Sequence, residues 1–235
     1  MPAQPAILGP DRPTDLDSLA AAPGISDVAL RLRLLLLRRS SFALATVVGA
    51  QGVVMRQVGT VLVVPESGEA IGFSPRGCLD GAIRDLAAEV LATGTSRLER
   101  FEIDPDAASY IGLSGQISLQ VHAMRVTAPD PCFGRMLRYL DSGDPLVVLM
   151  GIRGVSGCAA VGPDRVAGRL SWAELPQCVI VDARRMLGHF SYARKHYGRG
   201  GERGCDDAEL WMQSHPRSRL NPATGTVRVS IPLHA

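Results

Sequence analysis

The stretch that decides the fold of this chain is Ala70-Ile71-Gly72-Phe73-Ser74-Pro75-Arg76-Gly77-Cys78-Leu79-Asp80-Gly81-Ala82-Ile83. An apolar run typical of a strand leads into it, and a helical pattern leaves it from Leu79 to about Leu91. This order places Cys78 near a helix N-terminus, where unpaired N–H groups and the helix dipole favour an anion. The neighbouring Arg76 also favours the thiolate form of the cysteine. The segment therefore offers a nucleophilic or metal-seeking sulfur, a cradle for a phosphate, or both.

The same stretch resembles the Gly-Gly-Cys-(Val/Leu)-Glu-Gly signature of the XdhC/CoxI family, the accessory proteins of xanthine and carbon monoxide dehydrogenases. Residues 55–63 resemble the family's Pro-Arg-Pro-Val-Gly-Ala-x-Met stretch, and residues 112–117 resemble its Gly-Leu-x-Cys-Gly-Gly-x-Ile stretch. Residues 151–170 resemble the second half of the family pattern. The resemblance covers roughly residues 28 to 233, and the order and spacing of these motifs make it fairly specific.

The resemblance implies a site for the molybdenum cofactor, as molybdopterin or its cytidine dinucleotide. Cys78 would be the catalytic sulfur and the ligand to the metal. The cofactor-binding positions that the resemblance implies are Arg56, Gly59, Gly72, Arg76, Gly77, Cys78, Asp80, Gly81 and Ser114. Without the resemblance, Cys78 is a small buried hydrophobe, Arg56 is a loop arginine, and Asp80 is an acid that stabilises the first turn of a helix.

The chain departs from the family pattern at two places. Arg76 replaces a glycine, and it either grips a phosphate or fills the cradle, while Pro75 removes one N–H donor from the loop. Ser114 stands where the family has a second cysteine. This second departure argues against a mechanism that needs two thiols.

Three functions remain open at this point. The resemblance favours an accessory protein, more a maturation chaperone than an enzyme, which holds the cofactor during sulfuration and hands it to a molybdenum hydroxylase. Its implied partners are the apo-hydroxylase, a cysteine desulfurase, a full-length relative and a second copy of the chain. The alternatives are an adapter that no longer binds cofactor, and an enzyme that uses Cys78 in thiol chemistry. No His/Asp partner for Cys78 is recognisable, which argues against the enzyme.

Composition narrows the class of protein. The chain has 235 residues, 46% of them hydrophobic, and a formal net charge of +2, which indicates a globular protein with no nucleic-acid partner. The basic residues Arg194, Lys195, Arg199 and Arg203 favour a solvated glycine-rich loop over a contact with a phosphorylated ligand. No signal peptide or membrane span is recognisable. Five scattered cysteines predict no zinc site and no disulfide framework, so we expect a cytoplasmic protein.

The pattern along the chain predicts a compact α+β fold with mixed or antiparallel sheets, flanking helices, two lobes and no Rossmann domain. Residues 1–25 are expected to be a flexible tail, 26–128 the lobe with the Gly-Cys motif, and 129–235 a second lobe. Helices are predicted over residues 26–39, 79–91, 132–140, 176–187 and 206–213. Strands are predicted over residues 42–48, 59–64, 69–73, 97–103, 117–124, 145–152, 155–170 (as two) and 227–231. No internal repeat is recognisable in the sequence.

Overall fold

Two five-stranded sheets dominate the computed structural model, which describes residues 32, 34–52, 58–67, 70–72, 79–110, 115–198, 207–215, 219–220 and 227–228. The first sheet has the order β3-β2-β1-β5-β4. Its strands are β1 (Phe42–Gln51), β2 (Val61–Pro65), β3 (Ile71–Gly72), β4 (Arg97–Ile103) and β5 (Ile117–Val126). The second sheet has the order β8-β7-β6-β10-β9. Its strands are β6 (Leu146–Arg153), β7 (Gly157–Val161), β8 (Val166–Leu170), β9 (Tyr192–Tyr197) and β10 (Ala208–His215).

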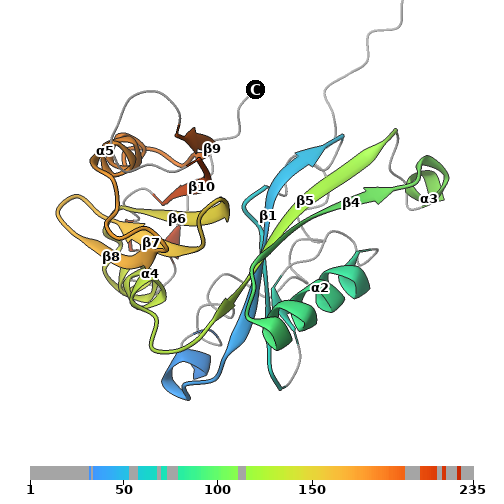
Figure 1. Cartoon of the computed structure of the whole chain (residues 1–235), viewed down its shortest axis with the longest axis horizontal. Coiled ribbons are helices and arrows are strands. Elements are labelled where there is room, and N and C mark those ends of the chain that lie inside the picture. Colours follow the sequence, from blue (N-terminus) through green and yellow to red (C-terminus); the bar gives the residue numbers. More distant parts are fainter. Residues whose placement is uncertain are drawn as a thin grey trace, which may run out of the picture.

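The helices cover the sheets on several sides (Figure 1). They are α2 (Asp80–Thr93), α3 (Pro105–Tyr110), α4 (Pro131–Ser142) and α5 (Gln177–Arg185). A short helical stretch, residues 34–37, precedes β1. Two further strands, β11 (Arg219–Leu220) and β12 (Val227–Arg228), pair only with each other.

Three apolar clusters order the molecule into layers. The outer face of the first sheet packs against Ile83, Ala87 and Val90 of α2. The outer face of the second sheet packs against Val179 and Ala183 of α5. Between the sheets, one cluster joins residues of both, including Phe42, Leu44, Val148, Met150 and Trp211. The two sheets therefore share a core.

Most of the predicted elements are confirmed, and so is the α+β class with antiparallel sheets. The helix from Leu79 becomes α2, and it ends at Gly94 in the left-handed conformation that favours glycine (φ 71°). The ambiguous segment 176–187 contains a helix, α5.

Two predictions in the second half are wrong. The segment 206–213 was expected to be a helix, but residues 208–215 form β10, which pairs with β6 and β9. Glu, Leu and Met favour helices in isolation, yet pairing on both sides overrides that preference. The basic segment around Arg194 was expected to be a loop, but Tyr192–Tyr197 is β9. The predicted strand 227–231 lies mostly outside the described residues, and its first two residues pair with β11.

The two halves of the chain repeat one topology, which the sequence does not reveal. Each half runs helix, three strands, helix and two strands, with the short helix α3 as an addition between the last two strands of the first half, and both sheets have the same strand order. The ladders β1–β5 and β6–β10 each contain one bulge, at Val48 and at Ile152, six residues into equivalent strands. The helix before each sheet ends on a left-handed residue, Arg39 (φ 54°) and Gly143 (φ 69°).

The contact between Thr46 and Met150 shows how the two halves face each other. These residues occupy equivalent positions in β1 and β6, 104 residues apart, and the Thr46 hydroxyl lies 3.8 Å from the Met150 sulfur. Equivalent residues touch one another when two units are related by a two-fold rotation. The chain is therefore arranged approximately as an internal dimer around this contact.

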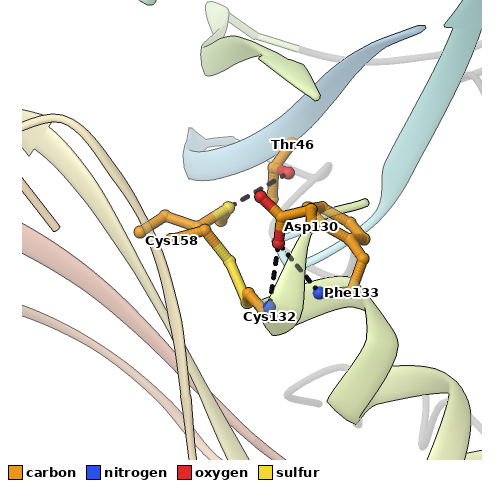
Figure 2. Close-up of a disulfide and its surroundings, with 6 residues drawn as sticks. Thr46, Asp130, Cys132, Phe133 and Cys158 are labelled. Atoms are coloured by element: carbon orange, nitrogen blue, oxygen red, sulfur yellow. Dashed lines mark hydrogen bonds between the residues drawn. A yellow bond between two sulfur atoms is a disulfide. The ribbon is translucent and has the colours of Figure 1, made fainter. Parts of the chain in front are cut away.

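A disulfide links α4 to β7, contrary to the expectation of an entirely reduced protein. Cys132 and Cys158 are bonded, and both are buried. Figure 2 shows the bond beside the start of α4, where the Asp130 carboxylate accepts hydrogen bonds from the N–H groups of Cys132 (2.8 Å) and Phe133 (3.1 Å). Burial raises the pKa of this carboxyl, although the two hydrogen bonds oppose the shift. The bond thus fixes the start of the second half against its own sheet.

Candidate functional site

The segments with the family motifs leave the first sheet at one end, which we call the motif end and define by Gln51, Gly59, Gly72 and Gln116. The segment with Arg56 begins after Gly52, where an added Cβ would lie 2.8 Å from the carbonyl oxygen of Gln116. The segment with Ser114 finishes just before Gln116. The segment with Arg76, Gly77 and Cys78 begins after Gly72, which pairs with Leu62 of β2. Arg56, Arg76, Gly77, Cys78 and Ser114 themselves lie outside the described residues.

Four of the predicted positions are described, and the backbone conformation explains two of them, Gly59 and Gly72. Gly59 (φ 89°) donates its N–H to the carbonyl of Val47 at 2.8 Å. Gly72 (φ 121°) lies so close to Val61 that an added Cβ would collide with its carbonyl oxygen. Gly168 holds the equivalent position in the second sheet, with φ 83°. These glycines are explained by the backbone, whether or not a ligand is bound.

The start of α2 is suited to an anion. Asp80 begins the helix, although its side chain lies outside the described part of the chain. No described side chain caps the N-terminus at Leu79, and Gly81 has open space where a Cβ would stand. N–H groups of the first turn therefore have no side-chain acceptor among the described residues.

A charged network joins the two sheets next to the motif end. Glu209 of β10 is 4% exposed and receives both ends of the Arg194 guanidinium, with Nη2 at 2.9 Å from Oε2. The same guanidinium donates to the amide oxygen of Gln120 in β5, across the space between the sheets. Gln120 is paired with Gly49 of β1, two residues before Gln51. The network is therefore a bridge from the second sheet to the motif end.

Two more side chains approach Glu209 from the solvent. Arg153 Nε lies 3.7 Å from one carboxylate oxygen, and His196 Nε2 lies 3.4 Å from the other. Burial alone would raise the pKa of Glu209, but the hydrogen bonds of Arg194 and the nearby positive charges lower it below its ordinary value. Glu209 is therefore ionised at neutral pH. Its single negative charge lies close to two positive charges, those of Arg194 and Arg153.

The structure divides the basic patch that the sequence suggested. Arg194 points to Glu209 and Gln120, whereas its neighbour Lys195 bonds to Asp182 of α5 on the opposite face of the sheet, with Nζ 3.0 Å from Oδ2. Arg199 and Arg203 lie outside the described residues. Sequence reasoning missed Gln120, Arg153, His196 and Glu209 because they are distant along the chain. Residues 192–196 and 209–213 lack a regular alternation of polar and apolar residues, so no sequence signal marks them as a two-faced strand pair.

Another buried polar residue is His122 of β5, which is 1% exposed. Neither of its ring nitrogens has a hydrogen-bond partner among the described groups, and burial lowers its pKa to about 4. Its equivalent in the second sheet is Trp211, whose indole nitrogen is likewise without a partner in the described structure. His122 is neutral in the folded protein at neutral pH.

Two absences concern the described part of the chain. It contains no group of three or more His, Cys, Asp or Glu side chains that could hold a metal ion. None of its helices is long and apolar enough to cross a membrane.

One family model matches part of the chain. Residues 35–102 match the model of the XdhC and CoxI family, and the match runs from the helical residues before β1 to the end of β4. A crystal structure described as a xanthine dehydrogenase from Bacillus halodurans is similar, with a TM-score of 0.48 and 20% identity. That similarity covers 63% of this chain and 46% of the other, so the chain spans less than half the length of that protein. No curated protein sequence matches.

Proposed function

Because residues 35–102 match the model of the XdhC and CoxI family, we propose that this protein is an accessory factor for the maturation of a molybdenum hydroxylase. It would hold the molybdenum cofactor while the cofactor is sulfurated and would then deliver it to the apo-enzyme. The observation that carries the proposal is this match, since the matched residues include the segments with Arg56 and Cys78 at the motif end.

The described residues fit an anionic cofactor in one respect. The first turn of α2 has N–H groups without a side-chain acceptor, and such groups bind phosphate. In this proposal Arg56 and Arg76 hold the phosphate, and the sulfur of Cys78 is a soft ligand close to the same helix start. The cofactor supplies the molybdenum centre that the client enzyme needs. The chain's own part is to bind this group, orient it and exclude water from it.

The implied partners belong to the same proposal. A molybdenum hydroxylase is the client, a cysteine desulfurase supplies sulfur, and a second copy or a full-length relative completes the assembly. We place the protein in the cytoplasm, where these enzymes act.

The test is to purify the whole protein from molybdenum-replete cells and measure bound pterin by fluorescence after oxidation, and molybdenum by mass spectrometry. We expect near-stoichiometric pterin. Cys78→Ser should retain pterin but lower the maturation of the client, because the hydroxyl keeps the shape and loses the soft sulfur. Cys178→Ser, on α5, is the matched control and should behave like the wild type. A wild-type protein without pterin would contradict the proposal.

One observation favours a second candidate, the adapter that binds no cofactor. Pro75, Arg76 and Ser114 all differ from the family pattern at the motif positions. The adapter predicts no pterin in the wild type and client maturation that does not respond to Cys78→Ser. The same two measurements therefore separate the candidates.

A further inference from the structure

β9 presents its residues alternately to two sides. Tyr192, Arg194 and His196 lie opposite Gln213, Trp211 and Glu209 of β10, on the face turned towards the first sheet. Lys195 and Tyr197 lie on the other face and contact Asp182 of α5. β9 is also the edge strand of the second sheet, so one flank of this row has no paired strand among the described residues. We call these six residues, together with Arg153 of β6, which approaches Glu209, the β9 strip.

One end of the β9 strip is an aromatic platform. The rings of Tyr192 and Trp211 are stacked, with centroids 5.3 Å apart and an angle of 23° between the planes. Trp211 is 1% exposed and Tyr192 is 45% exposed, so the accessible face of Tyr192 is the one turned away from Trp211. A planar ring can stack on such a face.

The other end of the β9 strip carries positive charge that its neighbours do not balance. Glu209 is committed to Arg194 through two hydrogen bonds. The side chains of Arg153 and His196 are 66% and 70% exposed, and Glu209 is the only acidic partner of either within the described structure. Guanidinium and imidazole groups in this situation attract an oxyanion.

The internal repeat shows which part of this charge is particular to the second half. The positions equivalent to Arg153, Arg194 and Glu209 are Gly49, Leu98 and Gln120 in the first half, whereas the position equivalent to His196 is Arg100, which pairs with Glu102. The ion pair of Arg194 with Glu209 and the nearby Arg153 therefore have no charged counterpart in the first sheet, so the shared fold does not require them.

The spacing of the two ends suits one class of ligand. Tyr192 and His196 are four residues apart on one strand, which is about 13 Å. A planar ring joined to a phosphate through a sugar is shorter than this backbone separation, and it reaches both ends because side chains as long as tyrosine and arginine extend along the strand. Gln213, next to Tyr192 in the strip, lies against Gly59 of the motif end, where an added Cβ would come within 3.0 Å of its Nε2.

We propose that the β9 strip is a binding site for a nucleotide-like ligand, whose planar ring stacks on Tyr192 and whose phosphate is held by Arg153 and His196. Arg194 and Glu209 position these groups, because their ion pair fixes the strip and crosses to Gln120. The natural identity of the ligand, a pterin or a nucleotide, rests on the proposed function; the ring and phosphate chemistry does not.

The test uses the whole protein and three probes in isothermal calorimetry: guanosine monophosphate, guanosine and inorganic phosphate. We expect the monophosphate to bind at least tenfold more tightly than either part alone. Tyr192→Leu should weaken the monophosphate and guanosine about tenfold and leave phosphate unchanged, and Tyr192→Phe should restore binding. Arg153→Gln should weaken the monophosphate and phosphate about tenfold and leave guanosine unchanged.

Arg169→Gln is the matched control, since Arg169 is exposed on β8 at the opposite edge of the same sheet. It should bind all three probes like the wild type. Absence of measurable binding of the monophosphate at 50 mM salt, or equal affinity in Tyr192→Leu, Arg153→Gln and Arg169→Gln, would overturn the proposal. If the protein retains pterin but does not bind the monophosphate, the proposed function stands and this site is refuted. If it binds the monophosphate but carries no pterin, this site stands and the proposed function is refuted.

Discussion

Glu209 shows how one buried charge is stabilised in this protein. It is nearly inaccessible to solvent, so removing it from water is costly, and hydrogen bonds from Arg194 offset that cost. Its pKa is lowered relative to the unfolded chain, and the group therefore adds stability at neutral pH. This contribution is lost as the pH falls through the folded-state pKa, when the carboxylate becomes protonated.

Glu209→Gln should lower the free energy of unfolding by about 2 kcal/mol at pH 7, because Arg194 keeps a polar partner but loses the opposite charge. The loss should shrink towards pH 3, as acidification approaches the lowered pKa of the wild-type carboxylate and begins to protonate it. Denaturant titration at both pH values measures this. Glu174→Gln, at an exposed position without a described contact, is the control. Equal stability of the two variants at pH 7 would contradict the prediction.

His122 differs from Glu209, because neither of its ring nitrogens has a hydrogen-bond partner among the described groups. The folded pKa of about 4 lies below the ordinary 6.5, so the unfolded chain binds a proton that the folded protein does not. The contribution of His122 to stability is complete above pH 6.5 and is lost as the pH falls to about 4. By this linkage the loss is about 3 kcal/mol.

His122→Met should therefore flatten the dependence of stability on pH between 6.5 and 4, and it should be neutral or stabilising at pH 7, since methionine has no unpaired nitrogen to bury. Denaturant titrations at pH 7, 5.5 and 4.5 provide the measurement. His215, whose pKa burial also lowers to about 4, remains in this variant and leaves some residual slope. His189→Gln, exposed, should keep the wild-type slope. An unchanged slope in His122→Met would refute this account.

At the scale of single elements, the close contact within the strand pairs β2–β3 and β7–β8 depends on one glycine in each pair. Gly72 and Gly168 both have positive φ and lie against the backbone of the neighbouring strand. We expect Gly72→Ala and Gly168→Ala each to lower stability by about 2 kcal/mol or more, from strain and from the collision of the new Cβ. Thermal unfolding checks this. Gly134→Ala in α4, which has open space, should raise stability by about 0.5–1 kcal/mol. If Gly72→Ala were as stable as the wild type in thermal unfolding, the close contact between Gly72 and the carbonyl of Val61 would be refuted.

The elements also show what sequence alone can predict. α2 was predictable because Leu79, Ile83, Leu86 and Val90 follow a helical period and Gly94 stops the helix. β10 was not, since Glu209 to Met212 favours a helix until β6 and β9 pair with it. The candidate site was predictable only in part. The motif segments were recognisable from their residues, but Gln120, Arg153 and Glu209 meet only in the folded chain.

At the scale of the whole molecule, the shared core decides how the protein unfolds. Phe42 and Met124 of the first sheet belong to the same cluster as Val148 and Trp211 of the second. Neither sheet can therefore lose its partner without exposing its inner face, and we expect a single cooperative transition.

Hydrogen exchange should give the slowest amides of α2 and β5 the same free energy of opening as those of β6 and β10. Val90→Ala, on the outer face of the first sheet, should lower the opening free energy of both halves by a similar amount, about 1–2 kcal/mol. Separate transitions, or an effect confined to the first half, would show that the halves are independent.

The two halves share a topology, yet no repeat is visible in the sequence. Equivalent positions such as Thr46 and Met150, or His122 and Trp211, share a place in the fold and not a residue type. Strand order, bulge position, left-handed turns and the glycine pair Gly72 and Gly168 are common to the halves, and these leave little trace in residue identity.

The contact of Thr46 with Met150 has a consequence for assembly. A two-fold arrangement is closed: once the two inner faces meet inside one polypeptide, that surface is used up and offers nothing to a further copy. Within the described part of the chain, the edge strands β3, β4, β8 and β9 and the outer helices α2 and α5 remain for an association between two chains. In a dimer of this protein, each chain would therefore contribute two sheets that are already related to each other by the internal two-fold rotation.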